Sequence, residues 1–465
     1  MSKPFDVIVV GSGYTGLSAA LKLQSEGSHV LVLEANNRVG GRALDVLVAG
    51  NFRLELGGQY IAPVQERVTR MISHLGLETY QAWGKGNNFM LYKEQIALHQ
   101  ETPAECIGKL LGDVSIQKEI EKTLSLLDAM QKDVPADKPW QYLDAHLWDS
   151  MTFQSWIDGH VTSAAAKEFF RFMTNQGFST EPEQVSLLQM LWFFKTSHGL
   201  PPWAIGGKQA NRVKGGTGLV AIKMAEKLKE PVRYDERVIK ISQSAENITV
   251  FTEKNIFSAK SAIVAIPPQM IPAIHYEPQI PSDIHRAFSS LQTGNAMKVQ
   301  AVFKTPFWRE KNLSGNGISF NRSPTFTYDN SGEAGTPGVL LGFLTGSQAT
   351  EMNKWSLEKR KQSILSTWAQ VFGSEIMDPI EYIEHNWLEE PNIRGGHGCH
   401  FPPGVWKELG AALGQKKMPH FQRIIWAASD LAKDWNGYLE GAIHAGEQAA
   451  IESLSYNIRK SQTKN

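Results

Sequence analysis

The pattern of apolar and polar positions is clearest near the start of the chain. An apolar run, Val7 to Val10, is followed by closely spaced glycines, by apolar residues at helical spacing, and by a second apolar run, Val30 to Leu33. The second run ends at Glu34. This order predicts a strand, a tight turn, a helix and a second strand that ends in an acid. We interpret these elements as one βαβ-type unit.

The same pattern predicts elements along the rest of the chain. Apolar residues at helical spacing predict helices over residues 65–77, 116–130, 164–174, 185–196, 217–228, 356–372 and 438–455. Apolar or alternating runs predict strands over residues 52–56, 232–241, 248–252, 256–266, 296–303, 338–344 and 423–427. Helix formers and aromatic residues dominate residues 80–197, so we expect a mostly helical insert there.

The order of these elements predicts an α/β fold of mixed α+β character, with two domains. The first is a Rossmann-like ligand-binding domain assembled from separated segments, residues 1–80, 206–288 and 394–459. The second is an inserted substrate-binding domain of mixed sheet and helices, residues 81–205 and 289–393, followed at the chain end by a polar tail, residues 460–465. A chain of 465 residues is long enough for two or three domains.

Composition and charge exclude several classes of function. Lys plus Arg and Asp plus Glu both total 47, so no overall field favours nucleic acid. The only cysteines, Cys106 and Cys399, rule out a disulfide framework and suit a reducing compartment. No run of 18 apolar residues suggests a membrane span, and the first strand begins too early for a signal peptide. We therefore expect a cytoplasmic protein, and we predict no metal site.

The glycines of the first unit have the spacing of a dinucleotide-binding turn. Gly11 allows a sharp turn, Gly13 leaves room for a pyrophosphate, and Gly16 lets the helix approach the strand. The phosphates would then lie at the N-terminus of the helix. Glu34 can accept hydrogen bonds from ribose hydroxyls. A second glycine turn, Arg38 to Arg42, places a cation beside the pyrophosphate and favours FAD over NAD.

A set of motifs in a consistent order carries a resemblance over nearly the whole chain. These motifs are Gly11 to Gly16, Glu34 with Arg38 to Arg42, Leu56 to Tyr60, Gly215 to Gly218, Ala265 to Pro268, Lys298 before Pro306 to Trp308, Trp387, Phe401 to Gly404, and Gly437 to Ala442. With them the chain resembles the flavin-containing amine oxidases, the monoamine oxidase-like family. The resemblance implies FAD, oxidation of a small primary or secondary amine to an imine that hydrolyses, and oxygen reduced to hydrogen peroxide.

The resemblance also assigns residues to the site. It implies catalytic roles for Lys298, Tyr438 and Trp387, with Lys298 holding a water near the flavin. Substrate-cavity positions are Tyr60, Gln209 and His400. Cofactor-binding positions are Gly11, Gly13, Tyr14, Thr15, Gly16, Glu34, Arg42, Gly57, Gly58, Gln59, Val238, Asp430 and Leu439.

The chain departs from the family pattern near its flavin end. Relatives often carry a cysteine after the paired glycines, which bonds the flavin, and then a second tyrosine wall. Here His397 follows the glycines, the segment is one residue short, and Cys399 comes two positions later. Covalent flavin through Cys399 is one reading, and His400 or Phe401 could form the second wall. Asn36 stands where relatives commonly carry arginine, so we expect Arg42 to bear more of the pyrophosphate charge.

Three alternatives remain open from the sequence. An amino-acid oxidase would need an arginine to bind the substrate carboxylate, for which Arg171 and Arg212 are candidates. An amine dehydrogenase would pass electrons to another acceptor. A non-catalytic FAD-binding scaffold would act through partners, and a homodimer is compatible with any of these.

Overall fold

The computed structural model describes residues 4–48, 52–199, 210–413 and 419–462. Its first sheet has the strand order β12-β9-β10-β11-β1-β2, with β21 beside β11 and β20 beside β21. β1, Phe5–Val10, is parallel to both of its neighbours, β2, Val30–Leu33, and β11, Ile256–Val264. The other strands are β9 Val238–Gln243, β10 Ile248–Thr252, β12 His275–Glu277, β20 His420–Phe421 and β21 Ile424–Trp426. Because β1 lies between two parallel strands and Val7 to Val10 are buried on both faces, this part of the strand is an unbroken apolar run.

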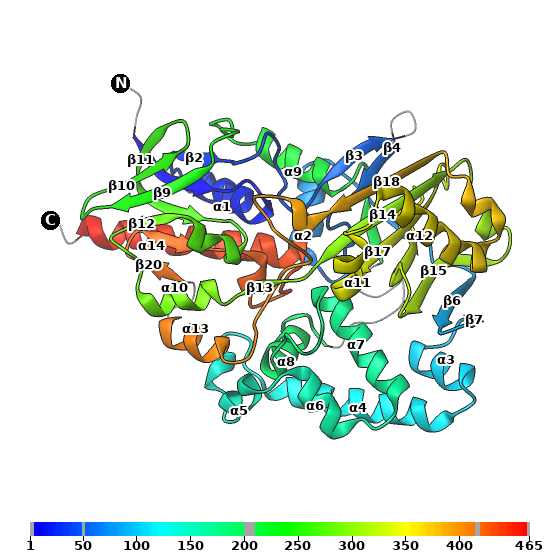
Figure 1. The fold of residues 1–465 in the computed structure, drawn as a ribbon. Helices are drawn as coiled ribbons and strands as arrows, with labels where there is room; N and C mark the ends of the chain where they lie inside the picture. The colour runs from blue at the N-terminus through cyan, green and yellow to red at the C-terminus, as the bar shows by residue number, and fades with distance from the viewer. Residues whose placement is uncertain (1–3, 49–51, 200–209, 414–418, 463–465) are drawn as a thin grey trace.

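Two helices far apart in sequence pack together on this sheet. α1, Tyr14–Ser25, lies beside α14, Leu439–Gln462, as Figure 1 shows. They approach so closely that a Cβ on Gly446 would lie 2.2 Å from the carbonyl oxygen of Thr15. The end of the chain is thereby held against its glycine-rich beginning. α9, Thr217–Glu226, packs against α1 as well.

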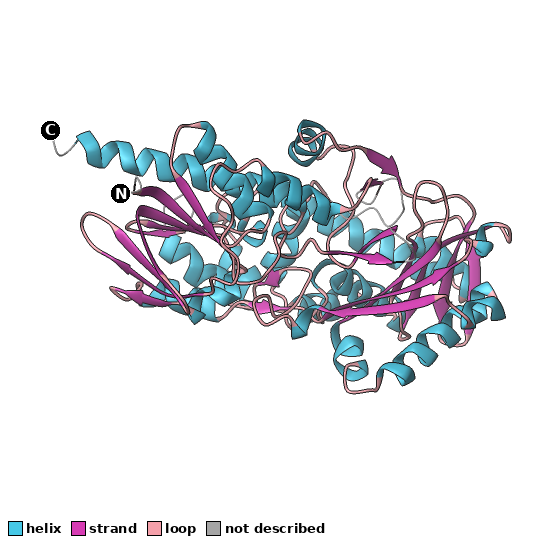
Figure 2. Ribbon diagram, turned by 90° about the horizontal axis from the view of Figure 1, so that it is seen from above, coloured by secondary structure: helices cyan, strands magenta, loops and turns pink. Residues whose placement is uncertain are grey.

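The second sheet has the order β18-β14-β17-β16-β15-β6-β7. Its strands are β6 Asn87–Tyr92, β7 Gln95–His99, β14 Ala296–Phe303, β15 Leu313–Phe320, β16 Phe326–Asp329, β17 Gly338–Thr345 and β18 Glu381–Asn386. α11, Gly346–Met352, and α12, Leu357–Phe372, pack on it. Figure 2 shows the two sheets toward opposite ends of the molecule.

A group of helices lies beside these sheets (Figure 1). They are α3 Pro103–Leu110, α4 Val114–Asp133, α5 Ala145–Ser150, α6 Phe153–His160, α7 Ala164–Phe178, α8 Leu187–Thr196, α10 Ser282–Ser289 and α13 Val405–Leu413. Hydroxyl caps start several of them: Ser163 accepts from the Ala166 N–H, and Ser186 accepts from the Gln189 N–H. The smaller elements are α2 Glu66–His74, β3 Asp45–Val48, β4 Phe52–Glu55, β5 Thr79–Gln81, β8 Asn211–Val213, β13 Gln292–Thr293 and β19 Cys399–His400.

The predicted mixed α/β fold is confirmed, with local corrections. The block expected to be mostly helical contains the hairpin of β6 and β7, which turns at Lys93 with a φ of 55°. The strand expected from residue 232 begins only at Val238. The last helix continues to Gln462, so the predicted polar tail is helical over its first residues. The domain bounds remain predictions. Among the described residues, no helix combines the length and apolar character that a membrane crossing requires.

Candidate active site

A cavity of about 640 Å³ is lined by segments from distant parts of the chain. Of the residues predicted from the sequence, its wall includes Gly11, Gly13, Tyr14, Thr15, Glu34, Arg42, Gly57, Gly58, Gln59, Tyr60, Val238, Lys298, Trp387, Cys399, Asp430, Tyr438 and Leu439. Gly16 and His400 are not on the wall, and Gln209 lies outside the described residues.

The glycine-rich turn brings bare backbone to one end of this cavity. Gly11 has a φ of +97°, and a Cβ there would lie 2.5 Å from the Ala265 carbonyl oxygen. A Cβ on Gly16 would lie 1.9 Å from the Gly11 carbonyl oxygen, so only glycine lets α1 start this close to β1. A Cβ on Gly13 would meet no protein atom closer than 4.0 Å, so glycine at this position leaves space in the cavity beside α1. The free N–H groups of the first turn of α1 therefore face an accessible space.

Glu34 lies on the cavity wall at the end of β2. Its carboxylate accepts hydrogen bonds from Ser12 N at 2.8 Å and Ser12 Oγ at 2.6 Å. It also accepts from Asn36 N at 2.9 Å and Asn36 Nδ2 at 3.1 Å. These contacts fix the carboxylate where it can accept further hydrogen bonds from ribose hydroxyls.

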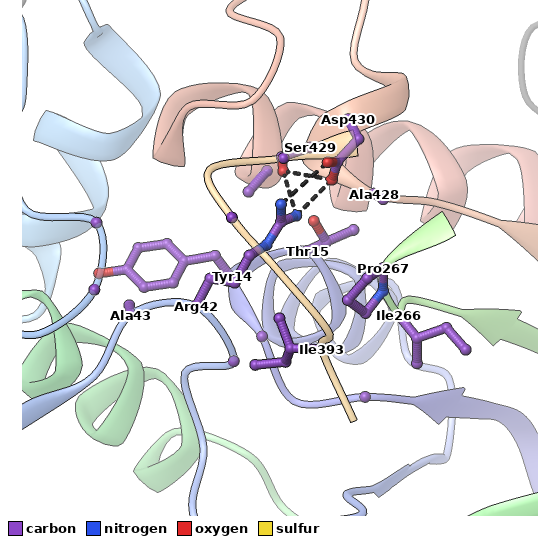
Figure 3. A pocket seen from close by; sticks show the side chains of 18 of the residues that line it. Tyr14, Thr15, Arg42, Ala43, Ile266, Pro267, Ile393, Ala428, Ser429 and Asp430 are labelled. Atoms are coloured by element: carbon purple, nitrogen blue, oxygen red, sulfur yellow. Dashed lines mark hydrogen bonds and ion pairs between the residues drawn. The ribbon is translucent and has the colours of Figure 1, made fainter. Parts of the chain in front are cut away.

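Arg42 and Asp430 form an ion pair on the same wall, in which the Asp430 carboxylate is buried and the Arg42 side chain is partly exposed (Figure 3). Arg42 Nη2 is 2.5 Å from Asp430 Oδ2 and 3.0 Å from Ser429 Oγ, and Arg42 Nη1 is 3.0 Å from Asp430 Oδ1. Burial would raise the pKa of Asp430, but the charge and hydrogen bonds of Arg42 lower it below its ordinary value. Asp430 balances the charge of the Arg42 guanidinium in this structure, and the role of Arg42 at the pyrophosphate stays a prediction.

This end of the cavity fits an FAD adenine nucleotide and pyrophosphate. Glycine backbone, a helix N-terminus and a fixed carboxylate are the groups that a dinucleotide requires, and they follow one another along the wall. The wall continues past Arg42 to Lys298 and Tyr438, which gives an extended cofactor room for its flavin. When bound, FAD supplies the acceptor for the hydride equivalent removed beside the amine.

Lys298 lies at the other end of the cavity, near the start of β14. Its side chain is 3% exposed. Nζ donates to the Glu55 carbonyl oxygen at 3.2 Å, to the Gly57 carbonyl oxygen at 2.7 Å, and to Gln59 Oε1. Burial lowers the pKa of Lys298 to about 7, and the nearby Glu55 carboxylate opposes that change. The amine can therefore exchange a proton near neutral pH at the cavity wall.

Aromatic side chains surround the cavity near Lys298. Tyr438 and Tyr60 are both half-buried and line the wall, and burial raises the pKa of each phenol. The buried Tyr60 hydroxyl has no hydrogen-bond partner among the described residues. Trp387 is 5% exposed and donates from Nε1 to the Leu56 carbonyl oxygen at 2.9 Å. Tyr60 and Tyr438 are thus placed for an organic substrate, and Trp387 is fixed on the same cavity wall by its hydrogen bond.

His397 lies on the cavity wall, a position that was not predicted from the sequence. Its side chain is exposed, but the exposed surface opens into the cavity. Nδ1 lies 2.8 Å from Ser179 Oγ, and the ring centroid is 5.7 Å from that of Phe343, another wall residue. The protein surrounding the cavity desolvates the His397 ring and lowers its pKa to about 4, and the charges of Lys298 and Arg42 contribute. The imidazole is therefore neutral at ordinary pH.

His400 and Phe401 do not form the second wall of the substrate cavity that the sequence suggested. The His400 side chain is fully buried, its ring centroid 6.2 Å from that of Phe178, because the strand alternation of β19 turns it away from the cavity. Phe401 is also fully buried and stacks on Trp406, so neither residue forms the second wall. Cys399 lies on the wall, but its N–H donates to Asp430 at 2.6 Å, and burial raises the pKa of its thiol.

Both arginines considered for carboxylate binding have other partners. Arg212 is 2% exposed, pairs with Glu55, and donates to the Asn330 carbonyl oxygen at 2.8 Å. Arg171 pairs with Glu181 and Glu183, each at 2.6 Å. Neither is on the cavity wall.

Sequence reasoning missed part of the site. The additional wall residues near the substrate end are Gln176, Gly177, Phe178, Phe193, Phe343 and His397. They come from the helical group, the second sheet and a loop, and no local motif connects them. Among these residues, only His397 could have been singled out from the sequence, because it directly follows the paired glycines Gly395 and Gly396.

Comparison with known proteins agrees with this geometry. The model of the family described as flavin containing amine oxidoreductase matches residues 14–452. The chain is 34% identical to amine oxidase [flavin-containing] A of Equus caballus, over 97% of this chain and 85% of that protein. It is 32% identical to the human amine oxidase [flavin-containing] B, over 98% and 87%.

Solved structures agree as well. Putrescine oxidase bound to putrescine superposes with a TM-score of 0.89 and 27% identity, and cyclohexylamine oxidase from Brevibacterium oxydans IH-35A with a TM-score of 0.90 and 25% identity. Each covers 97% of this chain and 99% of the solved chain. The chain therefore belongs to the flavin-containing amine oxidoreductase family and is an FAD-dependent oxidoreductase that acts on amines.

Proposed function

We propose that the substrate is a small primary or secondary amine with a single basic nitrogen, and that oxygen is the electron acceptor and is reduced to hydrogen peroxide. The observation that supports this substrate is the absence of a carboxylate from the substrate end of the cavity, among the described residues. That end is formed by aromatic side chains, Gln176, His397 and Lys298.

The acids on the cavity wall lie toward the nucleotide end or, in the case of Asp430, beside Arg42 and the Cys399 N–H. They are Glu34, Glu236, Glu253 and Asp430. Glu236 is held beside Glu34, since its N–H donates to the Glu34 carbonyl oxygen at 2.8 Å, and Asp430 is paired with Arg42. The residues that the structure does not describe contain no aspartate or glutamate in their sequence.

A second ammonium group on the substrate would therefore be buried without a counter-ion. Such burial costs several kcal/mol unless the group loses its proton, and the Lys298 charge adds repulsion. A neutral hydrocarbon or aromatic body instead gains about 25 cal/mol per Å² of apolar surface removed from water. The same apolar surroundings favour the unprotonated amine, which is the reactive form.

The amino-acid alternative receives less support. A substrate carboxylate would need a free cation, but Arg212 and Arg171 are paired with glutamates off the cavity wall. Arg42 is paired with Asp430 at the nucleotide end. Lys298 is the remaining cation near the aromatic walls within the described chain, and protein acceptors occupy its donors.

The test is peroxide formation by the purified holoenzyme with matched amines. Pentylamine, benzylamine and cyclohexylamine are compared with cadaverine, the diamine with the same chain length as pentylamine. We expect kcat/KM for pentylamine to exceed that for cadaverine at least tenfold, which corresponds to about 1.4 kcal/mol. A preference for cadaverine would refute the single-nitrogen proposal. Oxidation of amines without oxygen consumption would instead indicate another electron acceptor.

We also propose that FAD is bound without a covalent link, that the protein is cytoplasmic, and that it can form a homodimer. The neutral Cys399 thiol, held toward the Arg42 and Asp430 pair, supports the first proposal. The two free cysteines suit a reducing compartment and support the second. Cell fractionation tests the location, and light scattering of the purified protein tests the oligomeric state.

A further inference from the structure

We propose that Gln59, Asn330 and Gln300 form a one-directional chain of amide hydrogen bonds that positions Lys298 and keeps it as an ammonium ion. Lys298 is the catalytic residue through which these three would act, so they are positioning residues. The inference concerns the same site as the proposed function, but its test requires no substrate.

The amides form a continuous chain that runs from Lys298 to the Glu55 carbonyl oxygen at the end of β4. Gln59 Oε1 accepts from Lys298 Nζ, and Gln59 Nε2 donates to Asn330 Oδ1 at 2.6 Å. Asn330 Nδ2 donates to Gln300 Oε1 at 2.6 Å, and Gln300 Nε2 donates to the Glu55 carbonyl oxygen at 2.8 Å. That same carbonyl oxygen accepts from Lys298 Nζ at 3.2 Å, which closes the chain into a ring.

The ring is buried and held by regular structure. Gln300 and Asn330 are both fully buried, and Gln59 is 3% exposed. Lys298 and Gln300 are two residues apart on β14, so their side chains leave the same face of the strand. Arg212 holds the outside of the ring, because it donates to the Asn330 carbonyl oxygen at 2.8 Å and pairs with Glu55.

The direction of the chain follows from its last link. A backbone carbonyl oxygen can only accept, so Gln300 must turn its NH₂ group toward Glu55 and its oxygen toward Asn330. Asn330 must then turn its oxygen toward Gln59. The result is that Gln59 presents an oxygen to Lys298. One backbone carbonyl thus sets the orientation of all three amides.

This orientation favours the charged form of the lysine. An ammonium group has three donors, and three acceptors face it: two backbone carbonyl oxygens and Gln59 Oε1. A neutral amine would point its lone pair at one of these oxygens. Gln59 could relieve that contact only by turning its NH₂ group toward the amine. Asn330 and Gln300 would then have to turn as well, and the side-chain oxygen of Gln300 would face the Glu55 carbonyl oxygen.

The amide chain works against the other influences on Lys298. Burial and the Arg212 charge lower the pKa of Lys298, and the Glu55 and Asp45 carboxylates raise it. The charged and titratable groups around it are Asp45, Glu55, Arg212, His385 and His397. None of these groups belongs to the amide chain, so neutral substitutions in the chain leave the surrounding charges unchanged.

The experiment measures protonation of Lys298 directly in the oxidised holoenzyme. Protein labelled with [ε-¹³C]lysine is titrated by NMR, and the Lys298 signal is assigned by its absence from Lys298→Met. Asn330→Leu cuts the chain at a residue that does not contact Lys298. Gln189→Leu is the matched control, because Gln189 is also a fully buried amide, but its Oε1 accepts from Trp406.

We expect Asn330→Leu to lower the titration midpoint by about one pH unit, which is a tenfold fall in the ratio of ammonium to neutral amine at fixed pH. Gln300→Met, which is close in shape, should shift it in the same direction if Asn330→Leu folds poorly. Gln59→Leu combined with Asn330→Leu should shift it no further than Gln59→Leu alone, since both cut one chain. An unchanged midpoint in the folded Asn330 or Gln300 variant, or an equal shift in Gln189→Leu, would overturn the proposal.

Discussion

Replacing Lys298 with methionine should affect stability and catalysis in different ways. The substitution removes the only group in β14 that is charged near neutral pH while keeping an unbranched side chain of similar length. Lys304, an exposed lysine just beyond the same strand, provides a matched control in Lys304→Met. If Lys298 titrates in the folded protein, only its own variant should change the pH dependence of stability.

The magnitude follows from burial of the amine. Burial lowers the pKa of Lys298 from 10.5 to about 7, so between these values the unfolded chain binds a proton that the folded chain releases. Stability contributed by this group therefore rises with pH across that window. From pH 7 to 9 the gain is about 2 to 3 kcal/mol, from 1.36 kcal/mol per unit. Lys298→Met cannot show this gain.

Calorimetric Tm values of the parent and both variants, measured from pH 6 to 9, test the expected change. The Tm of the parent should rise relative to that of Lys298→Met by roughly 3 °C between pH 7 and 9, at about 1 to 2 °C per kcal/mol for a chain of this size. Lys304→Met should follow the parent. A constant difference between the parent and Lys298→Met would show that the buried amine does not titrate in this range.

Anaerobic stopped-flow measurements test the catalytic part. Loss of the Lys298 amine should slow flavin reduction or reoxidation at least tenfold, which is about 1.4 kcal/mol of transition-state stabilisation. Equal rates for the parent and Lys298→Met in both half-reactions would remove Lys298 from the mechanism.

Three further changes test other parts of the site. Asp430→Ala leaves the Arg42 guanidinium without its partner. We expect the Kd of FAD to rise at least tenfold, or about 1.4 kcal/mol, when binding is followed by the fluorescence of released cofactor. An unchanged Kd would contradict a role of this ion pair in FAD binding. Acid precipitation should release all flavin from the parent and from Cys399→Ser alike, whereas colour that stays in the parent pellet alone would establish a thioether. Burial, together with the Glu55 charge, raises the pKa of Asp45 to about 7, so stability from this carboxyl is lost as pH rises from about 4 to 7. The Tm of Asp45→Asn should therefore fall less than that of the parent between pH 5 and 8, and equal falls would argue against this shift.

The nucleotide end of the site could be predicted because its determinants are local in sequence. Gly11, Gly13 and Gly16 belong to a single turn, and Glu34 lies at the end of the next strand. Their spacing reflects backbone geometry, which is the same wherever this unit occurs. The first two strands of the first sheet were predictable for a related reason, since Val7 to Val10 and Val30 to Leu33 are buried and appear as continuous apolar runs.

The substrate end depends on contacts between distant segments. His397 was expected to be a departure from the family pattern, and only the folded chain shows its exposed surface inside the cavity. Asn330 and Gln300 lie 30 residues apart in sequence and appear as ordinary polar positions until β14 and the end of β16 come together. The hairpin of β6 and β7 was missed because its strands are short and adjoin a long helical block.

Ion-pair partners are a second feature that the sequence could not predict. Arg42 and Asp430 are separated by 388 positions, so the sequence suggested a cation for phosphate without showing its partner. Arg212 likewise appeared as a candidate for binding a substrate carboxylate until the structure placed Glu55 against it.

The central claim is that FAD in this cavity is reduced by an amine with a single basic nitrogen. The most direct measurement is the visible spectrum of the purified, FAD-loaded protein before and after anaerobic mixing with pentylamine, benzylamine and cyclohexylamine, with cadaverine and an amino-acid panel alongside. We predict that at least one of the three monoamines bleaches the flavin band within seconds, and that cadaverine and the amino acids bleach it at least tenfold more slowly, about 1.4 kcal/mol. Bleaching by cadaverine or amino acids but by none of the monoamines, or no bleaching at all, would contradict the account.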